Sequence, residues 1–343
     1  MKKQSKLLAL LLACAMTLAL SACGGSSATT STPASSAAPS ASGSAAATGD
    51  KTYTIGICQL VQHNALDAAT KGFTDALKEA LGDKVEVVKK NASGDSNNCS
   101  TIVNGFISDK VDLIMANATS ALQAAASATS TIPILGTSVT DYATALEIAD
   151  WTGTVGGNIS GTSDLAPLDK QAAMLQELFP NAKKVGMLFC SSEPNSKYQV
   201  DEVTKLLSAA GITCTGYTFT DSNDVSSVTQ KACDDSDVLY IPTDNTAASN
   251  TEAIANVVLA AGTPVIAGEA GICRGCGVAT LSIDYYELGK ITGQMAAKIL
   301  TGEAEISTMP VEFAPTATKQ ANMANCEKLG ITVPADYTAL ATE

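Results

Sequence analysis

The side chains best suited to chemistry in this sequence are short and polar, and they follow apolar segments that resemble strands. In open parallel sheets, ligands bind beyond the carboxyl ends of the strands. We therefore expect ligand contacts from polar residues at these positions and from those where the two halves of the chain meet. These candidates are Gln59, His63, Thr119, Ser120, Ser138, Thr140, Thr162, Asp164, Ser192, Asn195, Asp244, Asn245, Glu269 and Asp284.

Some of these positions indicate how a charged ligand would be held. Thr119 and Ser120 begin an expected helix, whose free N–H groups and dipole favour an anion such as a carboxylate. Their alternative role is to cap that helix. Glu269 can accept hydrogen bonds from an ammonium group, or it can be an ordinary solvated acid. Ser138 and Glu269 each lie five residues after a strand-initiating proline, so we expect them to face each other from equivalent strand ends.

The sequence gives little support for catalysis. Its one histidine is His63, and it contains no Gly-x-Ser-x-Gly elbow, phosphate-binding glycine loop or cluster of metal ligands. Asp141 and Asp164 could suggest acid–base chemistry, but each follows Ser or Thr in a segment that favours a turn. We expect neither an enzyme nor a bound cofactor.

Length and composition indicate a globular protein of about two domains. The chain has 343 residues, of which 45% are apolar and 4% aromatic. After the N-terminal segment, no apolar run reaches the roughly 18 residues that a membrane span needs. The net charge of −13 becomes more negative when a lysine-containing leader is removed. Such a surface repels nucleic acid and anionic lipid, so we expect a soluble globular part and no nucleic-acid partner.

The N-terminus has the pattern of a processing segment. Three lysines precede an apolar run from Leu7 to Leu20, which predicts a signal peptide over residues 1–22. The run ends in Leu-Ser-Ala-Cys23, like the lipobox of bacterial lipoproteins, so we expect lipid attachment at Cys23; the alternative is a plain secretory signal. Residues 23–50 are rich in Ser, Ala, Thr, Gly and Pro, which predicts a flexible tether.

Eight of the ten cysteines belong to the expected mature globular part. Export allows disulfides, although buried free thiols also act as small apolar groups. Cys273 and Cys276 are close enough in sequence for a local disulfide. A zinc site would need a second such pair, so we expect no metal.

Strand-like and helix-like segments alternate along the chain, which indicates parallel, doubly wound sheets. The expected strands are 51–60, 85–89, 111–116, 133–136, 184–189, 213–219, 238–241, 264–267, 278–283 and 311–313. The expected helices are 67–81, 97–108, 120–129, 168–179, 196–210, 225–233, 247–261, 285–300 and 321–329.

The order of elements occurs twice. Gly56 matches Gly186 and Asp112 matches Asp237 at nearly the same offset, which predicts two similar lobes rather than one large sheet. The remaining C-terminal elements suggest that the chain crosses back between the lobes. We assign residues 51–160 plus about 285–310 to lobe 1, and residues 161–284 plus about 311–343 to lobe 2.

The expected fold is therefore α/β, with two Rossmann-like lobes joined by a hinge of several crossovers. Residues 158–164 should form the first crossover. Thr162 and Asp164 would then lie at the floor of the cleft between the lobes.

Over about residues 51–335 the sequence resembles the ABC-transporter substrate-binding proteins of the tryptophan/tyrosine-type group, which have the type I periplasmic-binding-protein fold. The motifs that carry the resemblance are Gly161-Thr-Ser-Asp164 followed by Lys170-Gln171, Ser191-Ser-Glu-Pro-Asn-Ser196, Pro242-Thr-Asp-Asn-Thr246 and Asp284-Tyr-Tyr-Glu-Leu-Gly289.

The resemblance implies a monomeric receptor without enzymatic activity, held outside the cell membrane by its lipid. Its lobes would close on a small solute, expected to be an aromatic or apolar amino acid. The closed form would dock onto a membrane permease driven by a cytoplasmic ATPase. The alternative is a protein that senses another small solute, such as a nucleoside, peptide or sugar, and signals to a separate partner.

The family pattern also implies roles for individual residues. Thr119, Ser120, Ser138 and Thr140 match the groups that hold the α-carboxylate. Glu269 and Asp244 match the acids that hold the ammonium group, and Gln59 and His63 would line the side-chain end of the pocket. The pair Cys273 and Cys276 departs from this pattern.

Overall fold

Two sheets of mostly parallel strands form the framework of this computed structural model, which describes residues 51–340. The expected signal peptide, Cys23 and tether lie outside the described residues. The first sheet has the strand order β11-β5-β4-β3-β1-β2, and all of its pairings are parallel. Its strands are β1 (Tyr53–Gln59), β2 (Val85–Asn91), β3 (Leu113–Asn117), β4 (Ile134–Val139), β5 (Ile159–Ser163) and β11 (Glu312–Phe313).

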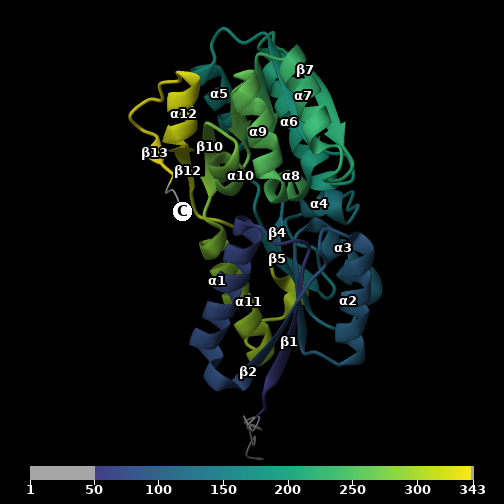
Figure 1. Cartoon of the computed structure of the whole chain (residues 1–343). Coiled ribbons are helices and arrows are strands. Elements are labelled where there is room, and N and C mark those ends of the chain that lie inside the picture. The colour runs from purple at the N-terminus through teal and green to yellow at the C-terminus, as the bar shows by residue number, and fades with distance from the viewer. Residues whose placement is uncertain (1–50, 341–343) are drawn as a thin grey trace, which may run out of the picture. The chain divides into compact units, whose positions relative to one another are not determined.

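Helices cover both faces of the first sheet (Figure 1). One layer contains α1 and α11, and the other contains α2 and α3, each with its own apolar core. The helical segments of this lobe are α1 (Asn64–Leu81), η1 (Gly82–Lys84), α2 (Ser96–Ser108), α3 (Thr119–Ala128), α4 (Tyr142–Ala145), α11 (Tyr285–Thr301) and η2 (Ile306–Thr308).

The second sheet has the order β13-β12-β10-β9-β8-β6-β7, and only β10 and β12 pair antiparallel. Its strands are β6 (Lys184–Cys190), β7 (Thr213–Phe219), β8 (Val238–Ile241), β9 (Val265–Ala267), β10 (Ala279–Ile283), β12 (Ala317–Ala321) and β13 (Thr338–Ala339). Its helices are α5 (Leu168–Leu178), α6 (Pro194–Ala209), α7 (Val225–Asp235), α8 (Asn245–Ser249), α9 (Thr251–Ala261), α10 (Ala270–Gly275) and α12 (Met323–Leu329).

The chain passes between the sheets after β5, after β10 and after β11. The second passage brings α11 back to the first lobe, where it packs tightly on α1. Glycine makes this close packing possible, since a Cβ at Gly72 would lie 2.0 Å from the Tyr286 carbonyl oxygen and one at Gly289 would lie 2.0 Å from that of Ala69. These passages confirm the expected fold class, with two lobes and several crossovers between them.

One expectation about the hinge needs correction. Most of the segment 158–164 is β5, a strand of the first sheet that pairs with β4, so the crossing begins only at Asp164. The lobe boundary expected after residue 160 would divide β5, whereas the strand pairing keeps β5 whole in the first sheet and also places β11 there rather than in lobe 2. Apart from Ile159, β5 is made of small residues, Ser-Gly-Thr-Ser, and therefore lacks the apolar pattern that marks a strand.

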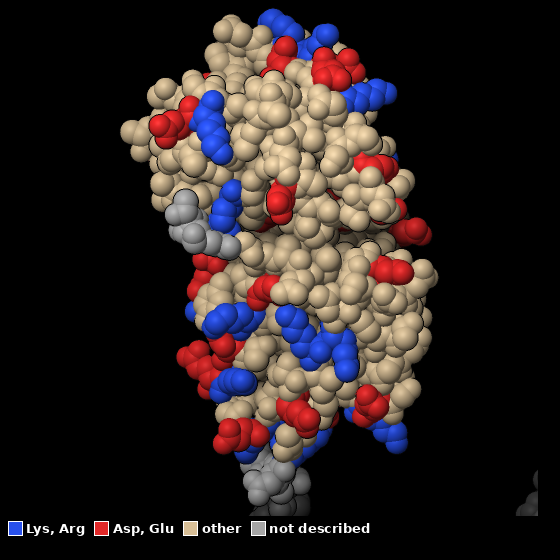
Figure 2. All heavy atoms as spheres, viewed as in Figure 1, with Lys and Arg blue, Asp and Glu red and all other residues tan. Residues whose placement is uncertain are grey.

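Within residues 51–340, no helix is both long and apolar enough for a membrane span. Acidic and basic side chains are interspersed over the face shown in Figure 2, with uncharged surface between them.

Candidate functional site

Four buried side-chain oxygens between the lobes have no hydrogen-bond partner among residues 51–340. These unpaired oxygens are Thr119 Oγ1, Ser138 Oγ, Asp164 Oδ1 and Asn195 Oδ1, on residues that are at most 5% exposed. Thr119 and Asp164 follow β3 and β5, and Ser138 lies near the end of β4, the strand between these two. Asn195 begins α6 of the second lobe, which packs on α4 of the first.

Buried polar groups are nearly always satisfied by protein, water or ligand. Several unpaired oxygens at the ends of adjacent strands therefore indicate a place where a polar ligand binds. Asn117 Oδ1, Thr280 Oγ1 and Gln320 Oε1 also lack partners within the described part of the chain, and Asn117 belongs to the same strand end as Thr119.

The start of α3 offers hydrogen-bond donors for an anion. No side chain within residues 51–340 caps this helix: its N-cap is Ala118, with a φ of 92°, so the capping role considered for Thr119 and Ser120 is not observed. The first backbone N–H groups of a helix lack intrahelical partners, and the Thr119 hydroxyl lies beside them. Together they suit a carboxylate.

Ser138 lies at the end of β4 in an unusual backbone conformation. Its φ is 55°, in the left-handed region that non-glycine residues rarely adopt and that is often found at functional sites. Thr140 is 2% exposed, and its carbonyl oxygen accepts a 2.7 Å hydrogen bond from Ser163 Oγ. This part of the site is therefore held rigidly by β5.

Asp164 is the buried acid with an unpaired oxygen. Its Oδ2 accepts a 2.9 Å hydrogen bond from the Tyr285 hydroxyl, while Oδ1 lacks a partner within residues 51–340. Burial raises the pKa of Asp164 to about 6 and the charge of Glu269 adds to this effect, while the side chains of Tyr285 and Thr140 oppose it. A nearby ammonium group would favour the ionised form of such a carboxyl.

The two acids that the sequence favoured for the ammonium group have other partners. The Glu269 carboxylate caps α10 and accepts hydrogen bonds from the backbone N–H groups of Gly271 and Ile272. Asp244 caps α8 and accepts hydrogen bonds from Cys190 N and Ala247 N, each at 2.7 Å. Burial, followed by the charge of Glu193, raises the pKa of Asp244 to about 8.

Three other candidates are used within their own lobe. Gln59 is fully buried, donates to Val61 O and Asp67 Oδ1, and accepts a hydrogen bond from Thr70. The hydroxyl of Thr162 is paired with those of Thr137 and Thr292. Asp284 is exposed and caps α11 through Tyr286 N and Glu287 N.

The remaining candidates meet at the boundary between the lobes. His63 Nε2 lies 3.2 Å from Asn245 Oδ1. Ser120, Ser192 and Asn245 line a cavity of about 210 Å³ to which both lobes contribute. His63 and Glu269 line a neighbouring cavity of about 180 Å³.

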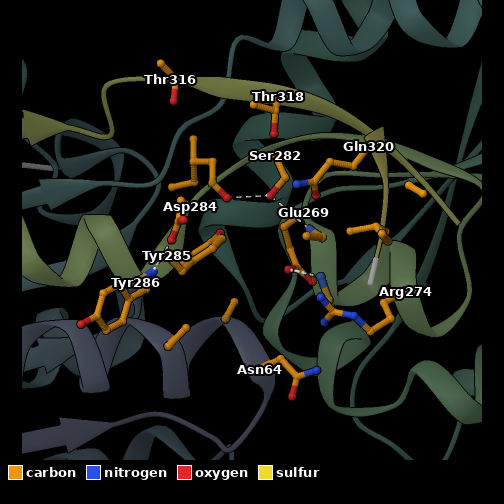
Figure 3. A pocket seen from close by; sticks show the side chains of 17 residues that line it. Asn64, Glu269, Arg274, Ser282, Asp284, Tyr285, Tyr286, Thr316, Thr318 and Gln320 are labelled. Atoms are coloured by element: carbon orange, nitrogen blue, oxygen red, sulfur yellow. Dashed lines mark hydrogen bonds between the residues drawn. The ribbon is translucent and has the colours of Figure 1, made fainter. Parts of the chain in front are cut away.

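A larger cavity of about 470 Å³ lies on the other side of Glu269, next to the crossings between the lobes. Figure 3 shows Glu269, Arg274, Ser282 and Gln320 around it, with Asn64 opposite them at the start of α1. Glu269 lines both this cavity and that of about 180 Å³, so its side chain forms part of the wall between them.

Two important residues were not among the sequence candidates. Glu193 is 5% exposed, and its carboxylate accepts hydrogen bonds from Asn195, Asn245 and Thr246. Tyr285 holds Asp164. A loop acid looks solvent-exposed in the sequence, but Glu193 and Tyr285 each lie within a motif that carries the family resemblance.

The described residues contain no cluster of three or more His, Cys, Asp or Glu side chains that could hold a metal ion. All eight cysteines in the described range, including Cys273 and Cys276, are free. The local disulfide that the sequence allowed is therefore not formed in this structure.

The family model described as "ABC transporter substrate binding protein" matches residues 54–343. A tyrosine-binding protein of Clostridioides difficile is 37% identical over 264 residues, which are 76% of this chain and 76% of that protein.

Two solved structures show the same fold. The first, an ABC domain from Streptococcus pneumonia in complex with L-Trp, has a TM-score of 0.81 and 30% identity and covers 85% of this chain and all of its own. The second is the ligand-free, open structure of a substrate-binding protein with adhesive properties from Clostridium difficile. It has a TM-score of 0.65 and 36% identity, with the same coverage. The chain therefore belongs to the ABC-transporter substrate-binding proteins, which bind solutes and are not enzymes.

Proposed function

We propose that this protein captures an aromatic amino acid, tyrosine or tryptophan, between its two lobes and delivers it to a membrane permease with its ATPase. The observation that carries the proposal is that four buried oxygens, three on residues at neighbouring strand ends of the first lobe and one in the first turn of α6 in the second, lack a hydrogen-bond partner within residues 51–340. The relatives support the ligand class, since one is a tyrosine-binding protein and another was solved with L-Trp.

In this proposal the ligand's α-carboxylate lies at the start of α3. Thr119, Ser120, Ser138 and Thr140 supply hydroxyl groups there, and the helix supplies N–H groups and the positive end of its dipole. The unpaired oxygens of Thr119 and Ser138 then gain the partner that they lack within residues 51–340.

The ammonium group lies against Asp164 Oδ1 and Asn195 Oδ1, both of which are acceptors without a partner in the described range. Asp164 supplies the charge, so this hydrogen bond is charge-assisted and stronger than a neutral one. Glu269, which the family pattern favoured, contributes less to holding the ammonium group in this proposal, because its oxygens already cap α10.

The ligand's side chain points toward the cavity of about 210 Å³. This cavity has an apolar wall made by Leu60 and Val61 and polar groups from Ser120, Ser192 and Asn245. A phenolic hydroxyl finds hydrogen-bond partners in such surroundings. We therefore expect tyrosine to bind more tightly than phenylalanine, because buried polar groups left without a partner disfavour the analogue that lacks the hydroxyl.

The protein acts outside the cytoplasm as a monomer, anchored by a lipid on Cys23 and tethered through residues 23–50. The support for this part is the order of a cationic segment, an apolar run and Leu-Ser-Ala-Cys23 in the sequence. Membership of the family agrees with a site of action outside the cytoplasm.

Calorimetry of residues 51–343 against tyrosine, tryptophan, phenylalanine and tyramine tests the proposal. We expect saturable binding of tyrosine or tryptophan. Tyramine lacks the carboxylate and should bind at least about tenfold more weakly, because a hydrogen bond to a charged group contributes about 1.5–3 kcal/mol. Equal binding of tyramine would contradict the carboxylate site at α3. Binding of a nucleoside, peptide or sugar instead would favour the alternative of a sensor for another solute.

A further inference from the structure

We propose that His63 and Asn245 form a latch that holds the two lobes together over the bound solute, and that Glu193 orients it. This inference rests on the proposed function and goes beyond it, because it assigns His63 to lobe closure rather than to ligand contact. His63 is 182 residues before Asn245, and their side chains meet at 3.2 Å.

In the second lobe, hydrogen bonds to Glu193 fix the orientation of Asn245. Asn245 Nδ2 donates a 2.7 Å hydrogen bond to Glu193 Oε2, and the backbone N–H of Asn245 donates to the same oxygen at 3.0 Å. The other oxygen of Glu193 accepts hydrogen bonds from the backbone and the hydroxyl of Thr246, each at 2.8 Å. Asn245 therefore keeps its orientation whether or not the first lobe touches it.

This arrangement decides which atom of the latch donates. A carboxylate only accepts hydrogen bonds, so the amide of Asn245 must turn its NH₂ group toward Glu193 and its oxygen toward His63. His63 must then carry a proton on Nε2.

The imidazole has no competing task in the described structure. His63 is the N-cap residue of α1, yet its side chain does not cap the helix within residues 51–340. The first turn of α1 is held instead by the backbone, through the hydrogen bond from Asp67 N to His63 O. Removing the imidazole therefore tests the contact between the lobes and leaves the helix start intact.

The contact lies between the two smaller cavities. His63 lines the cavity of about 180 Å³, Asn245 lines that of about 210 Å³, and Ser249 lines both. In Figure 1, α8, which begins with Asn245, lies at the edge of its lobe nearest the first lobe. Breaking the latch would join these cavities and open a path for the solute.

The comparison structures agree with a latched arrangement. The chain is more identical to the ligand-free, open relative, at 36%, than to the L-Trp complex, at 30%. Its TM-score is nevertheless 0.65 with the open relative and 0.81 with the L-Trp complex. The latch is thus present in a lobe arrangement closer to that of the ligand-bound relative.

A double-mutant cycle tests the latch through the release rate of bound tyrosine or tryptophan, measured by stopped-flow fluorescence. His63→Ala and Asn245→Ala should each speed release about 2- to 12-fold, the range that corresponds to a typical net hydrogen bond. The double variant should release no faster than Asn245→Ala alone, because without Asn245 the imidazole has no latch partner to lose. His63→Gln, which keeps a donor, should restore part of the slow release. Gln62→Ala removes an exposed side chain from the same loop and is the matched control.

If His63→Ala still speeds release in the Asn245→Ala background, His63 contacts the ligand directly and the latch is wrong. A second readout needs no ligand: small-angle scattering of the ligand-free protein should give a larger radius of gyration for both single variants than for the wild type. Equal radii would overturn the latch even if no amino acid binds, whereas absence of amino-acid binding with larger radii would contradict only the proposed function.

Discussion

The two lobes share a framework but use their polar side chains differently. In both lobes an aspartate before the third strand fixes the start of the first: Asp112 accepts from Thr54 N at 2.9 Å, and Asp237 accepts from Lys183 N and Lys184 N at 2.7 and 2.9 Å. At the boundary the lobes differ. Three of the four unpaired oxygens belong to the first lobe and its crossing.

The acids of the second lobe are tied to their own backbone. Glu193 and Asp244 hold the start of α8, and Glu269 holds that of α10. This difference suggests that the two lobes have different roles in binding. The first lobe keeps groups available for the polar end of the ligand, while the second lobe presents a wall that is ordered before binding, which lowers the entropy cost of closure.

Of the substitutions considered, Asp164→Asn should weaken ligand binding the most. It removes the charge that pairs with the ammonium group, so we expect the dissociation constant to rise about 10- to 150-fold, the equivalent of about 1.5–3 kcal/mol. The thermal midpoint of the ligand-free protein should not fall, because burial disfavours the ionised carboxyl. Calorimetry and thermal unfolding measure the two effects.

Asp83→Asn is the control, since it removes an equal charge from an exposed position far along the chain. An unchanged dissociation constant for Asp164→Asn would mean that the ammonium group is held elsewhere.

The pH dependence of ligand affinity should reflect the titration of the Asp164 carboxyl. The pKa of Asp164 is raised from 3.8 to about 6, so the group is ionised at neutral pH and becomes protonated below about 6. The affinity should fall toward tenfold per pH unit there, because the ligand needs the ionised form. The unfolding free energy of the ligand-free protein should change in the opposite direction. A raised pKa means that the folded state binds the proton more tightly than the unfolded state does, so protonation of Asp164 increases the unfolding free energy as pH falls from about 6 to 4.

Calorimetry and unfolding between about pH 4 and 8 measure both trends, and Asp164→Asn should abolish them. Titration of Asp244, whose pKa is raised to about 8 by burial and then by Glu193, would persist in that variant. A slope below pH 6 that also persists would assign the effect to another group.

Glu269→Gln should give the smallest change in binding. We expect less than about a threefold loss of affinity, because the carboxylate caps α10, and a fall in unfolding free energy of about 0.5–2 kcal/mol, as for other lost caps. Denaturant unfolding and calorimetry separate these effects. A loss of affinity as large as that of Asp164→Asn would indicate that Glu269 binds the ammonium group, as the family pattern implied.

Much of the fold could be predicted because apolar periodicity is local. The strand Thr213–Phe219 has the predicted bounds, and most other expected elements agree within two or three residues. The expected helix 247–261 is in fact α8 and α9, separated at Asn250. Asp244 caps the first of them from an extended backbone conformation.

The elements that were missed are short or lack an apolar pattern. They are α4, β5, α10, β12, β13 and the two 3-10 helices η1 and η2. In β12, Ala-Thr-Lys-Gln-Ala has few apolar residues, and the strand forms through antiparallel pairing with β10. Pairing of this kind is a long-range interaction that no local window contains.

The sequence by itself determined which polar residues stand near strand ends and helix starts, because those positions follow from apolar pattern and turn chemistry. Only the tertiary structure decided what each of them does there. Glu269 and Asp164 are alike in the sequence, but the backbone of α10 satisfies the first, whereas the second keeps an oxygen without a partner within residues 51–340. Which hydrogen bonds a buried carboxylate makes depends on groups brought close by folding, and these are distant along the chain.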